Sequence, residues 1–465
     1  MKVFITSFGC RVNQYEGEQI REGFVRRGYN FIEDHREADI CVVNTCTVTE
    51  NADKDARRIL RKIGRDNPGA KLIITGCYAS RAPGELEELF PGALIVSNLD
   101  KENIPTLSGC SMGLGAGATA ISSFYGHTRA YIKVQDGCNM KCTYCIIPST
   151  RPVMSSRPVE EILAEIRGLF DAGYREFVLC GIRLGRYWAQ ESEERGVRSE
   201  EGKAFLNLDA SRLTPHASRD KWVDLIGLIR RIAQLPGDFR IRLSSIEVTD
   251  LTDRFLDEYA QIPKAVPYFH VPIQSGSDEV LSAMKRWYNT DFYRRRIAAI
   301  HKVLGEEVGL FTDFMVGFPT ETGSEFDRSL KFVLEIGFAG LHIFRYSARK
   351  TTPAADVTPV YAGDEMENRI QKARVADRGL RENYARRFVG RTMPILWEEH
   401  SGGRLKGRAE NFLEVFSREQ GTGSREKKER ENVDLHDSPF PIPYSREWQT
   451  VKITDVEGEK LVTHA

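Results

Sequence analysis

The sequence predicts an α/β protein made of three successive units. We expect an N-terminal open parallel α/β domain over residues 1–125, a central partial barrel of six βα units over residues 126–389, and a small antiparallel β-barrel over residues 390–465. Short apolar runs alternate with amphipathic helical patterns along the first two units, which is typical of parallel sheets. Apolar and polar residues alternate near the C-terminus, where this pattern predicts antiparallel strands.

Composition narrows the protein class. The 465 residues include 66 Lys and Arg against 66 Asp and Glu, and 41% are hydrophobic, which excludes a wholly disordered or collagen-like chain. No uncharged apolar run approaches the ~18 residues of a membrane span, and the start does not resemble a signal peptide. We therefore expect a cytoplasmic protein whose nine cysteines serve as metal or catalytic ligands rather than as a disulfide framework.

The first unit contains three apolar runs, at residues 3–7, 40–44 and 71–75. Each is followed by a cysteine and then by a polar, helix-like stretch, a repeat that predicts parallel strands. The glycine-rich residues 109–117 that follow are expected to be a linker, because glycine disfavours regular structure through its backbone entropy.

Six strands are expected in the central unit. They are placed near residues 131–134, 176–180, 240–244, 268–272, 310–316 and 341–345. This number suits an open or partial barrel, with the site at the C-terminal ends of the strands. The polar stretch 188–221 is expected to be a surface insertion.

The last unit begins after a long helical pattern at residues 364–389. Alternating runs at 393–398, 411–416 and 450–454 predict strands of the small barrel. The charged run 418–437 that interrupts them is expected to be a solvated loop.

The segment DGCNMKCTYC is the strongest chemical signal. Cys138, Cys142 and Cys145 follow a predicted strand with C-x3-C-x2-C spacing, so three thiolates can cap three corners of a cubane cluster and leave the fourth iron without a protein ligand. A structural zinc site normally needs four closed ligands, and no fourth lies nearby in the sequence. Structural zinc and spectator thiols remain the alternatives.

A second triplet is spread along the first unit. Cys10, Cys46 and Cys77 each lie just beyond the C-terminal end of a predicted parallel strand, and such ends line one edge of a sheet. A second three-cysteine cluster is favoured, whereas three small core or turn residues are the alternative. Cys41, Cys110 and Cys180 belong to neither triplet and are expected to be spectators.

The C-x3-C-x2-C triplet, with Tyr144 before its last cysteine, resembles the radical S-adenosylmethionine enzymes. Further segments are similar to the methylthiotransferases: GCRVNQYEGEQI, NTCTVTENADKDARR, TGCYA, HTRAYIKVQDGC, CIIP, VPIQSGSDEVLSAMKR, TDFMVGFPTET and YSARKTTPAA. The chain most closely resembles the MtaB-type branch, which acts on N6-threonylcarbamoyladenosine next to the tRNA anticodon. The match runs from Lys2 to about Ala355, and the terminal barrel is similar to the RNA-holding TRAM domain of these enzymes.

This resemblance implies a radical barrel fold, a transferase activity and a set of cofactors. Cys138, Cys142 and Cys145 would hold the [4Fe-4S] cluster that cleaves S-adenosyl-L-methionine to a 5'-deoxyadenosyl radical, and Cys10, Cys46 and Cys77 an auxiliary [4Fe-4S] cluster that supplies sulfur. The product would be a methylthio group at carbon 2 of the adenine. The implied partners are tRNA and a reducing electron donor protein; we expect a monomer and no membrane.

The sequence alone leaves other functions open. The branch that takes isopentenyl-adenosine and the one that methylthiolates a ribosomal protein share both triplets. A non-catalytic iron-sulfur protein that binds RNA, or a zinc-bound RNA chaperone, would not cleave S-adenosylmethionine.

Cofactor contacts are expected from Tyr144, Ser244, Ser245 and Gln274. Tyr144 would pack against the adenine of the cofactor or is a plain loop aromatic. The other three lie near strand ends, where polar side chains line a barrel mouth but also commonly cap turns. No catalytic side chain is assigned, and His270 is expected to be a core histidine.

Two loops depart from the family pattern. Arg183 stands where the family usually has Asn, and Arg151, Pro152 and Val153 stand where it usually has an Arg-Gly segment. Neither change is conservative, because arginine adds a fixed charge and proline removes a backbone donor. The cofactor contacts of these loops, and the substrate preference, therefore cannot be carried over from the family pattern.

RNA phosphates are expected to meet local basic surfaces, since the chain as a whole is neutral. Residues 345–391 carry 11 Lys and Arg against 6 Asp and Glu. Arg57, Arg58, Arg61 and Lys62 form a second candidate, and the alternative is that these charges only solvate helices.

Overall fold

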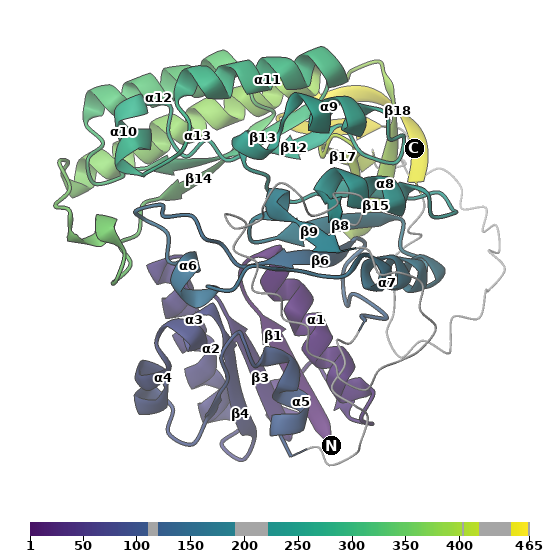
Figure 1. The fold of residues 1–465 in the computed structure, drawn as a ribbon, viewed down its shortest axis with the longest axis vertical. Coiled ribbons are helices and arrows are strands. Elements are labelled where there is room, and N and C mark those ends of the chain that lie inside the picture. The colour runs from purple at the N-terminus through teal and green to yellow at the C-terminus, as the bar shows by residue number, and fades with distance from the viewer. Residues whose placement is uncertain (110–119, 191–221, 402–403, 418–447, 464–465) are drawn as a thin grey trace.

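The computed structural model describes residues 1–109, 120–190, 222–401, 404–417 and 448–463. The expected linker 109–117, the insertion 188–221 and the charged run 418–437 lie wholly or largely outside these residues. Within the described part, the α/β architecture and the three units are present (Figure 1).

The N-terminal unit is a five-stranded, fully parallel sheet in the order β2-β1-β3-β4-β5. Its strands are β1 (Lys2–Ser7), β2 (Asn30–Phe31), β3 (Ile40–Thr45), β4 (Lys71–Gly76) and β5 (Leu94–Ile95). Helices α1 (Arg11–Val25) and α5 (Ile104–Leu107) cover one face, and α2 (Glu50–Asp66), α3 (Cys77–Arg81) and α4 (Pro83–Leu89) the other. Because both faces are buried, the central strands are continuous apolar runs.

The central unit is an open barrel. Its parallel strands are β6 (Ala130–Asp136), β8 (Glu176–Gly181), β11 (Arg240–Leu243), β12 (Tyr268–His270), β13 (Gly309–Val316) and β14 (Gly340–Arg345). Two sheets, β11-β8-β6-β7 and β12-β13-β14, are joined by single bridges such as Ser245 to His270. Since β6 pairs with β8 and the short antiparallel β7 (Ser155–Ser156), and β14 only with β13, the barrel stays open between β6 and β14.

Helices surround this barrel, and α11 to α13 run along the top in Figure 1. The outer helices are α7 (Val159–Asp171), α8 (Leu225–Ala233), α9 (Asp253–Ala260), α10 (Asp278–Ala283), α11 (Thr290–Leu304) and α12 (Gly323–Ile336). The barrel loops contain α6 (Ile147–Thr150), the hairpin strands β9 (Trp188–Gln190) and β10 (Trp222–Asp224), and the 3-10 turns Leu184–Arg186, Val248–Asp250 and Pro353–Asp356. Two further 3-10 turns, His35–Glu37 and Lys101–Asn103, belong to the N-terminal unit. One large apolar core joins these helices to the strands.

The last unit follows the long helix α13 (Gly363–Arg386). It is a closed barrel in the order β15-β16-β17-β19-β18. Its strands are β15 (Thr392–Ser401), β16 (Arg404–Ala409), β17 (Glu414–Ser417), β18 (Trp448–Glu457) and β19 (Lys460–Thr463). The expectation of a purely antiparallel barrel needs one correction, because β17 and β19 pair in parallel.

The turn between β16 and β17 connects two barrels. Phe412 stands 5.1 Å from the ring of Tyr268 and is held at a φ of 72°. Arg242 donates to the Glu410 carbonyl at 2.8 Å, and its guanidinium lies 4.9 Å from the Phe412 ring. The turn therefore plugs the N-terminal end of the open barrel.

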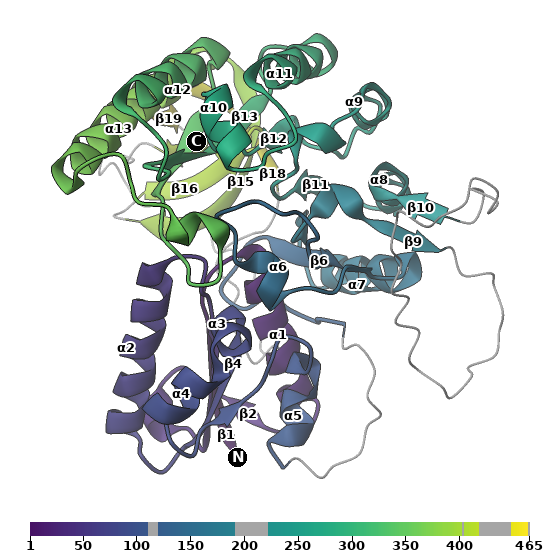
Figure 2. The same cartoon turned by 60° about the vertical axis from the view of Figure 1, so that its left-hand side comes forward.

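The N-terminal unit packs against the open side of the central barrel (Figure 2). Tyr15 of α1 is fully buried in the barrel core, where its hydroxyl contacts Glu165 at 2.9 Å and Arg157 at 2.7 Å. In the described residues we find no helix long and apolar enough to cross a lipid bilayer.

Candidate functional site

Cys10, Cys46 and Cys77, here called the N-terminal triad, follow β1, β3 and β4 at one edge of the sheet. The strand order changes direction between β1 and β3, and ligands of open α/β sheets bind outside the strand ends at such a point. Cys10 and Cys46 flank this point. The thiols interact electrostatically with one another, so the fold brings the three predicted residues together.

Two glycines permit this close approach. A Cβ on Gly9, whose φ is 93°, would lie 2.7 Å from the Cys46 sulfur. A Cβ on Gly76, whose φ is 98°, would overlap the Thr45 carbonyl oxygen. The buried Asn13 amide then joins the loops, donating to the carbonyls of Phe8 at 2.6 Å and Thr45 at 3.1 Å.

The N-terminal thiols lie in a poorly solvated edge. Burial raises the pKa of Cys46 to about 11, with further contributions from Cys77 and Cys10. Desolvation also raises the pKa of Cys10, although this side chain is the one of the three that retains contact with solvent. Metal binding must therefore displace protons from these thiols.

Cys138, Cys142 and Cys145, here called the barrel triad, lie on the loop after β6. Gly137, at a φ of 78°, makes the turn, and a Cβ there would overlap the Val153 carbonyl oxygen. Thr143 anchors the middle of the loop, since its amide bonds to the Met284 carbonyl at 3.1 Å and its hydroxyl to Ala283 at 2.9 Å.

A buried arginine faces the barrel triad. Arg286 donates to the Cys142 sulfur at 3.5 Å and to the Tyr288 hydroxyl at 3.3 Å, and it forms an ion pair with Glu247. Such a cation stabilises negative charge on sulfur. Burial raises the pKa of Cys145 to about 12.

An ion-pair network connects the two triads. This junction cluster consists of Arg151, Glu16, Asp136, Lys101 and Lys133. Arg151 binds both Glu16 oxygens, at 2.8 and 2.7 Å, and both Asp136 oxygens at 2.9 Å. Burial raises the pKa of Glu16, but Arg151 and the two lysines outweigh it and hold that pKa well below its usual range.

Arg151 contacts both sides of the junction. Its carbonyl accepts the Cys138 amide at 3.3 Å, while its guanidinium lies within electrostatic reach of Cys10 and Cys77. Arg151 is 2% exposed. The departure noted at Arg151 and Pro152 therefore lies in the seam between the units.

Two of the expected cofactor contacts carry buried polar atoms without a partner among the described residues. These atoms are the Ser244 Oγ and the Gln274 Oε1. Gln274 also adopts a φ of 66°, which is rare for a residue other than glycine and is held by backbone bonds to Asp313 and Met315 at 2.9 Å. Strain and unsatisfied groups of this kind are typical of ligand sites.

The remaining two expected contacts differ from these. Ser245 is exposed just beyond β11. Tyr144 packs edge-on against Phe318, with ring centroids 6.5 Å apart, in a small apolar cluster beside the barrel triad. His270 bonds to Asp313 at 2.9 Å and is 9% exposed, as expected of a core histidine.

Arg183 projects toward the barrel mouth. It is 3% exposed and lies 5.1 Å from the Trp287 ring, 3.8 Å from Asp250 and within electrostatic reach of Cys138. Its Nε and Nη2 atoms have no hydrogen-bond partner in the part of the chain described. This second departure therefore lies beside the barrel triad.

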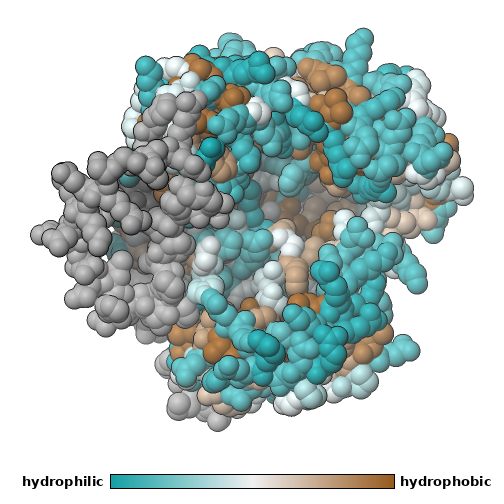
Figure 3. Space-filling view, turned by 180° about the vertical axis from the view of Figure 1, so that it is seen from behind, coloured by the Kyte–Doolittle hydropathy of each residue, from teal (hydrophilic) through white to brown (hydrophobic). Residues whose placement is uncertain are grey.

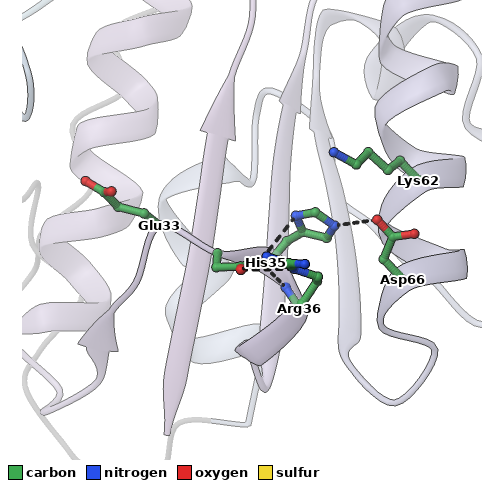
Figure 4. Close-up of a pocket in the computed structure, with 6 residues that line it drawn as sticks. Glu33, His35, Arg36, Lys62 and Asp66 are labelled. Carbon is green, nitrogen blue, oxygen red and sulfur yellow. Dashed lines mark hydrogen bonds and ion pairs between the residues drawn. The ribbon is translucent and has the colours of Figure 1, made fainter.

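One cavity, of about 510 Å³, lies away from both triads (Figure 4). It is lined by His35, Arg36, Lys62 and Asp66, and His35 bonds to Asp66 at 3.1 Å. These residues stand at the N-terminal end of the sheet, opposite the edge that carries the N-terminal triad. Figure 3 shows that the surface is also hollowed between the lower and upper parts of the molecule.

Family comparisons agree with this division. Residues 2–97, which include the N-terminal triad, match the family described as "Uncharacterized protein family UPF0004". Residues 132–333 match the Radical SAM superfamily and contain the barrel triad.

Relatives with assigned functions extend along most of the chain. It is 31% identical to the threonylcarbamoyladenosine tRNA methylthiotransferase MtaB of Thermotoga maritima, over 91% of this chain and 92% of that protein. The Bacillus subtilis MtaB is 32% identical over 88% of each chain. The chain belongs to the radical S-adenosylmethionine methylthiotransferase family. A tRNA-2-methylthio-N(6)-dimethylallyladenosine synthase of Cereibacter sphaeroides is 30% identical over 87% of this chain and 89% of that protein.

A solved structure supports the fold of this methylthiotransferase. The radical S-adenosylmethionine methyltransferase TsrM of Kitasatospora setae, with cobalamin and a [4Fe-4S] cluster bound, aligns over 76% of each chain with a TM-score of 0.53 and 13% identity. The predicted fold class and enzyme class are thus confirmed.

The donor sets fit iron-sulfur clusters better than a single ion. In the described ranges, no three His, Cys, Asp or Glu side chains gather closely enough to hold one metal ion. A cubane instead spreads its three ligating sulfurs over separate corners, and thiolates are the ligands it requires. Both triads supply thiols alone, and a cation lies near each: Arg151 is within electrostatic reach of Cys10 and Cys77, and Arg286 donates to Cys142.

Sequence reasoning missed several residues around this site. Arg286 was not expected, and its only signal was its place in the segment VPIQSGSDEVLSAMKR. The role of Glu16 depends on burial that spacing does not reveal. Of the cysteines expected to be spectators, Cys41 packs in the core, Cys180 lies near Cys10 inside the barrel, and Cys110 is outside the described residues.

Many charges of the basic stretch 345–391 bind the protein itself. Arg349 pairs with Asp53 of the N-terminal unit, Arg369 with Glu321 at 3.0 Å, and Arg381 with Asp377 at 2.8 Å. In the second basic candidate, Arg57 bonds to Tyr78 at 2.7 Å, whereas Arg58 has an 83% exposed side chain. The surface available to phosphates is therefore smaller than the charge count indicates.

Proposed function

We propose that this methylthiotransferase acts on tRNA and inserts a methylthio group at carbon 2 of N6-threonylcarbamoyladenosine next to the anticodon. The observation that carries this proposal is the similarity, over at least 88% of each chain, to two relatives named for that reaction. We further propose domains at 1–125, 126–389 and 390–465, the last holding RNA, and a monomeric, cytoplasmic enzyme with a separate electron donor protein.

Two [4Fe-4S] clusters are proposed, one on each triad. When bound, the clusters and S-adenosylmethionine supply radical generation, sulfur and the methyl group. The chain's own residues hold these reactants in one place: the junction cluster fixes the spacing of the triads, and Arg286 offsets the negative charge of the Cys142 thiolate. Ser244, Gln274, Ser245 and Tyr144 are proposed to orient S-adenosylmethionine at the barrel mouth, because the first two have buried polar atoms with no partner among the described residues.

The alternative substrate is isopentenyl-adenosine, since the dimethylallyladenosine synthase is 30% identical to this chain. Mass spectrometry of tRNA nucleosides separates the two. Bulk tRNA that lacks methylthio groups is incubated anaerobically with the reconstituted enzyme, S-adenosylmethionine, sulfide and a reductant. Formation of the methylthio derivative of threonylcarbamoyladenosine is expected. Formation of the isopentenyl derivative alone would overturn the substrate assignment. If neither derivative formed, the proposal that the enzyme acts on tRNA would be overturned.

A further inference from the structure

A second cavity, of about 330 Å³, lies where the three units meet. Strands β12 to β14, helix α13, two turns of the terminal barrel and the first residue of α1 all contribute to its walls. This volume is at the lower end of the ~300–1,000 Å³ typical of small-molecule sites. It is large enough for a modified group of a nucleotide but not for an RNA strand.

The cavity has a cationic lining. Arg11, Arg381, Arg408 and Lys460 line it, against the carboxylates of Glu414 and Glu459. Three of the four cations are already paired: Arg381 with Asp377 at 2.8 Å, and Arg408 and Lys460 with Glu414 at 3.3 and 3.5 Å.

Arg11 differs from the other three cations. Within the described residues no carboxylate pairs with it; its guanidinium interacts with the Tyr268 hydroxyl and stands 5.9 Å from the Tyr131 ring. A guanidinium in a recess prefers a carboxylate or phosphate that it can bind with two parallel hydrogen bonds. Arg11 therefore provides an unneutralised charge inside the cavity.

Two imidazoles add hydrogen-bonding capacity. His270 and His342 both line the cavity, and both contact the same Asp313 oxygen, at 2.9 and 3.4 Å. Each ring uses one nitrogen for this contact and keeps the other for a ligand. The His342 side chain remains 79% exposed, so a ligand can reach it.

We propose that this cavity binds the N6-threonylcarbamoyl group of the substrate, with Arg11 pairing the threonyl carboxylate and His342 bonding its hydroxyl. The inference rests on the proposed function and assigns its specificity to named residues. Arg11 directly follows Cys10, so the base would lie beside the N-terminal triad. An isopentenyl group has no polar atoms, so it would leave the Arg11 charge and the second nitrogen of each imidazole without a ligand partner, which is how polar sites reject apolar analogues.

The test uses three anticodon stem-loop RNAs of one sequence that differ only in the N6 group: threonylcarbamoyl, its uncharged methyl ester, and isopentenyl. Dissociation constants are measured by fluorescence anisotropy with the reconstituted enzyme, alongside initial rates of methylthiolation. We expect the wild type to bind the threonylcarbamoyl RNA about 10- to 100-fold more tightly than the ester, the range of a charge-assisted hydrogen-bond pair. Arg11→Gln should bind both equally, and Arg11→Lys should restore part of the preference.

Arg26→Gln, at the other end of α1, is the matched control, because its exposed pair with Glu22 lies outside the cavity. Iron content identifies any variant that fails to load its clusters, and the ester RNA tests the wild type without a substitution. If the wild type bound the threonylcarbamoyl RNA and its methyl ester equally well, the cavity assignment would be overturned. The proposed function would still stand if the threonylcarbamoyl RNA were methylthiolated. Loss of preference in Arg26→Gln would likewise count against Arg11.

Discussion

The barrel triad lies on one loop, whereas the N-terminal triad comes from three loops that only the sheet brings together. The first needs Gly137 and the Thr143 anchors, while the second needs two glycines, the Asn13 bonds and the parallel order of β1, β3 and β4. One site is thus encoded by spacing and the other by topology. Small backbone changes should therefore affect the second more than the first.

The largest expected effect comes from Cys142→Ala. Removing one of three ligands from the barrel triad should lower 5'-deoxyadenosine formation by about 1,000-fold or more, because the radical step needs an intact cluster. The N-terminal triad should keep its iron, about four atoms per chain. Cys41→Ala, in the sheet core, is the control and should retain both clusters; unchanged cleavage in Cys142→Ala would contradict the assignment.

Cys46→Ala should give the opposite pattern. We expect cleavage of S-adenosylmethionine to stay within about two-fold of wild type, since the barrel triad is intact, while methylthiolation is lost. Iron analysis and nucleoside mass spectrometry measure both. If cleavage fell together with methylthiolation, the two triads would not be separable sites.

Arg151→Met tests the connection between the triads. It would remove the bidentate partner of Glu16 but leave Lys101 and Lys133 beside it, so we expect a loss of about 1.5–3 kcal/mol of unfolding free energy. Urea unfolding measures this cost. The double variant Arg151→Met with Glu16→Gln should recover part of it; no recovery would show that the two residues act independently.

Gly76→Ala should disturb the N-terminal triad selectively. A Cβ there meets the Thr45 backbone at a φ of 98°, so we expect a loss of about 1–3 kcal/mol and reduced iron on this triad alone. Gly84→Ala is the matched control, because nothing lies within 4 Å of its added Cβ. Equal iron content in the two variants would contradict the idea that the N-terminal triad depends on the close backbone packing at Gly76.

A pH dependence of the unfolding free energy is also predicted, of at most about 3 kcal/mol for a carboxyl whose pKa rises from 4.5 to about 7. Burial raises the pKa of Glu321 in the central barrel to about 7, and burial does the same for Glu18 in the N-terminal unit. Because the folded pKa exceeds the unfolded value of 4.5, this stabilisation is complete below about pH 4.5 and is lost as the pH rises through 7. Glu321→Gln should flatten the pH dependence of Tm between pH 5 and 8; an unchanged slope would show that Glu321 does not titrate in this range.

Repeating apolar runs made the sheets predictable. All three expected N-terminal strands and all six of the central barrel are present, whereas β2, β5, β7, β9, β10, β16 and β19 were missed. The first two contain two residues each, too few for a period, and β16 carries alternate charges like a loop. The parallel β17–β19 pair depends on barrel closure, which local alternation does not encode.

The candidate site was predictable only where chemistry depends on residue type. Cysteine spacing and strand ends located both triplets, but Arg11, Arg286 and Glu16 resemble ordinary surface charges in the sequence. Their importance comes from burial and from neighbours far along the chain, such as Cys142 for Arg286. At residues 345–391 the charge count overestimated the surface available to RNA phosphates, because several arginines pair with carboxylates of the protein itself.

The buried charges between Arg151 and Glu16 also bear on how the enzyme can move. Rotating the N-terminal unit away from the barrel would separate the buried Glu16 from Arg151 and Lys133, so this seam resists a hinge motion. We therefore expect the separation between the two triads to change little during the reaction. Under the proposed function, a tRNA base that meets both triads would have to reorient itself between them.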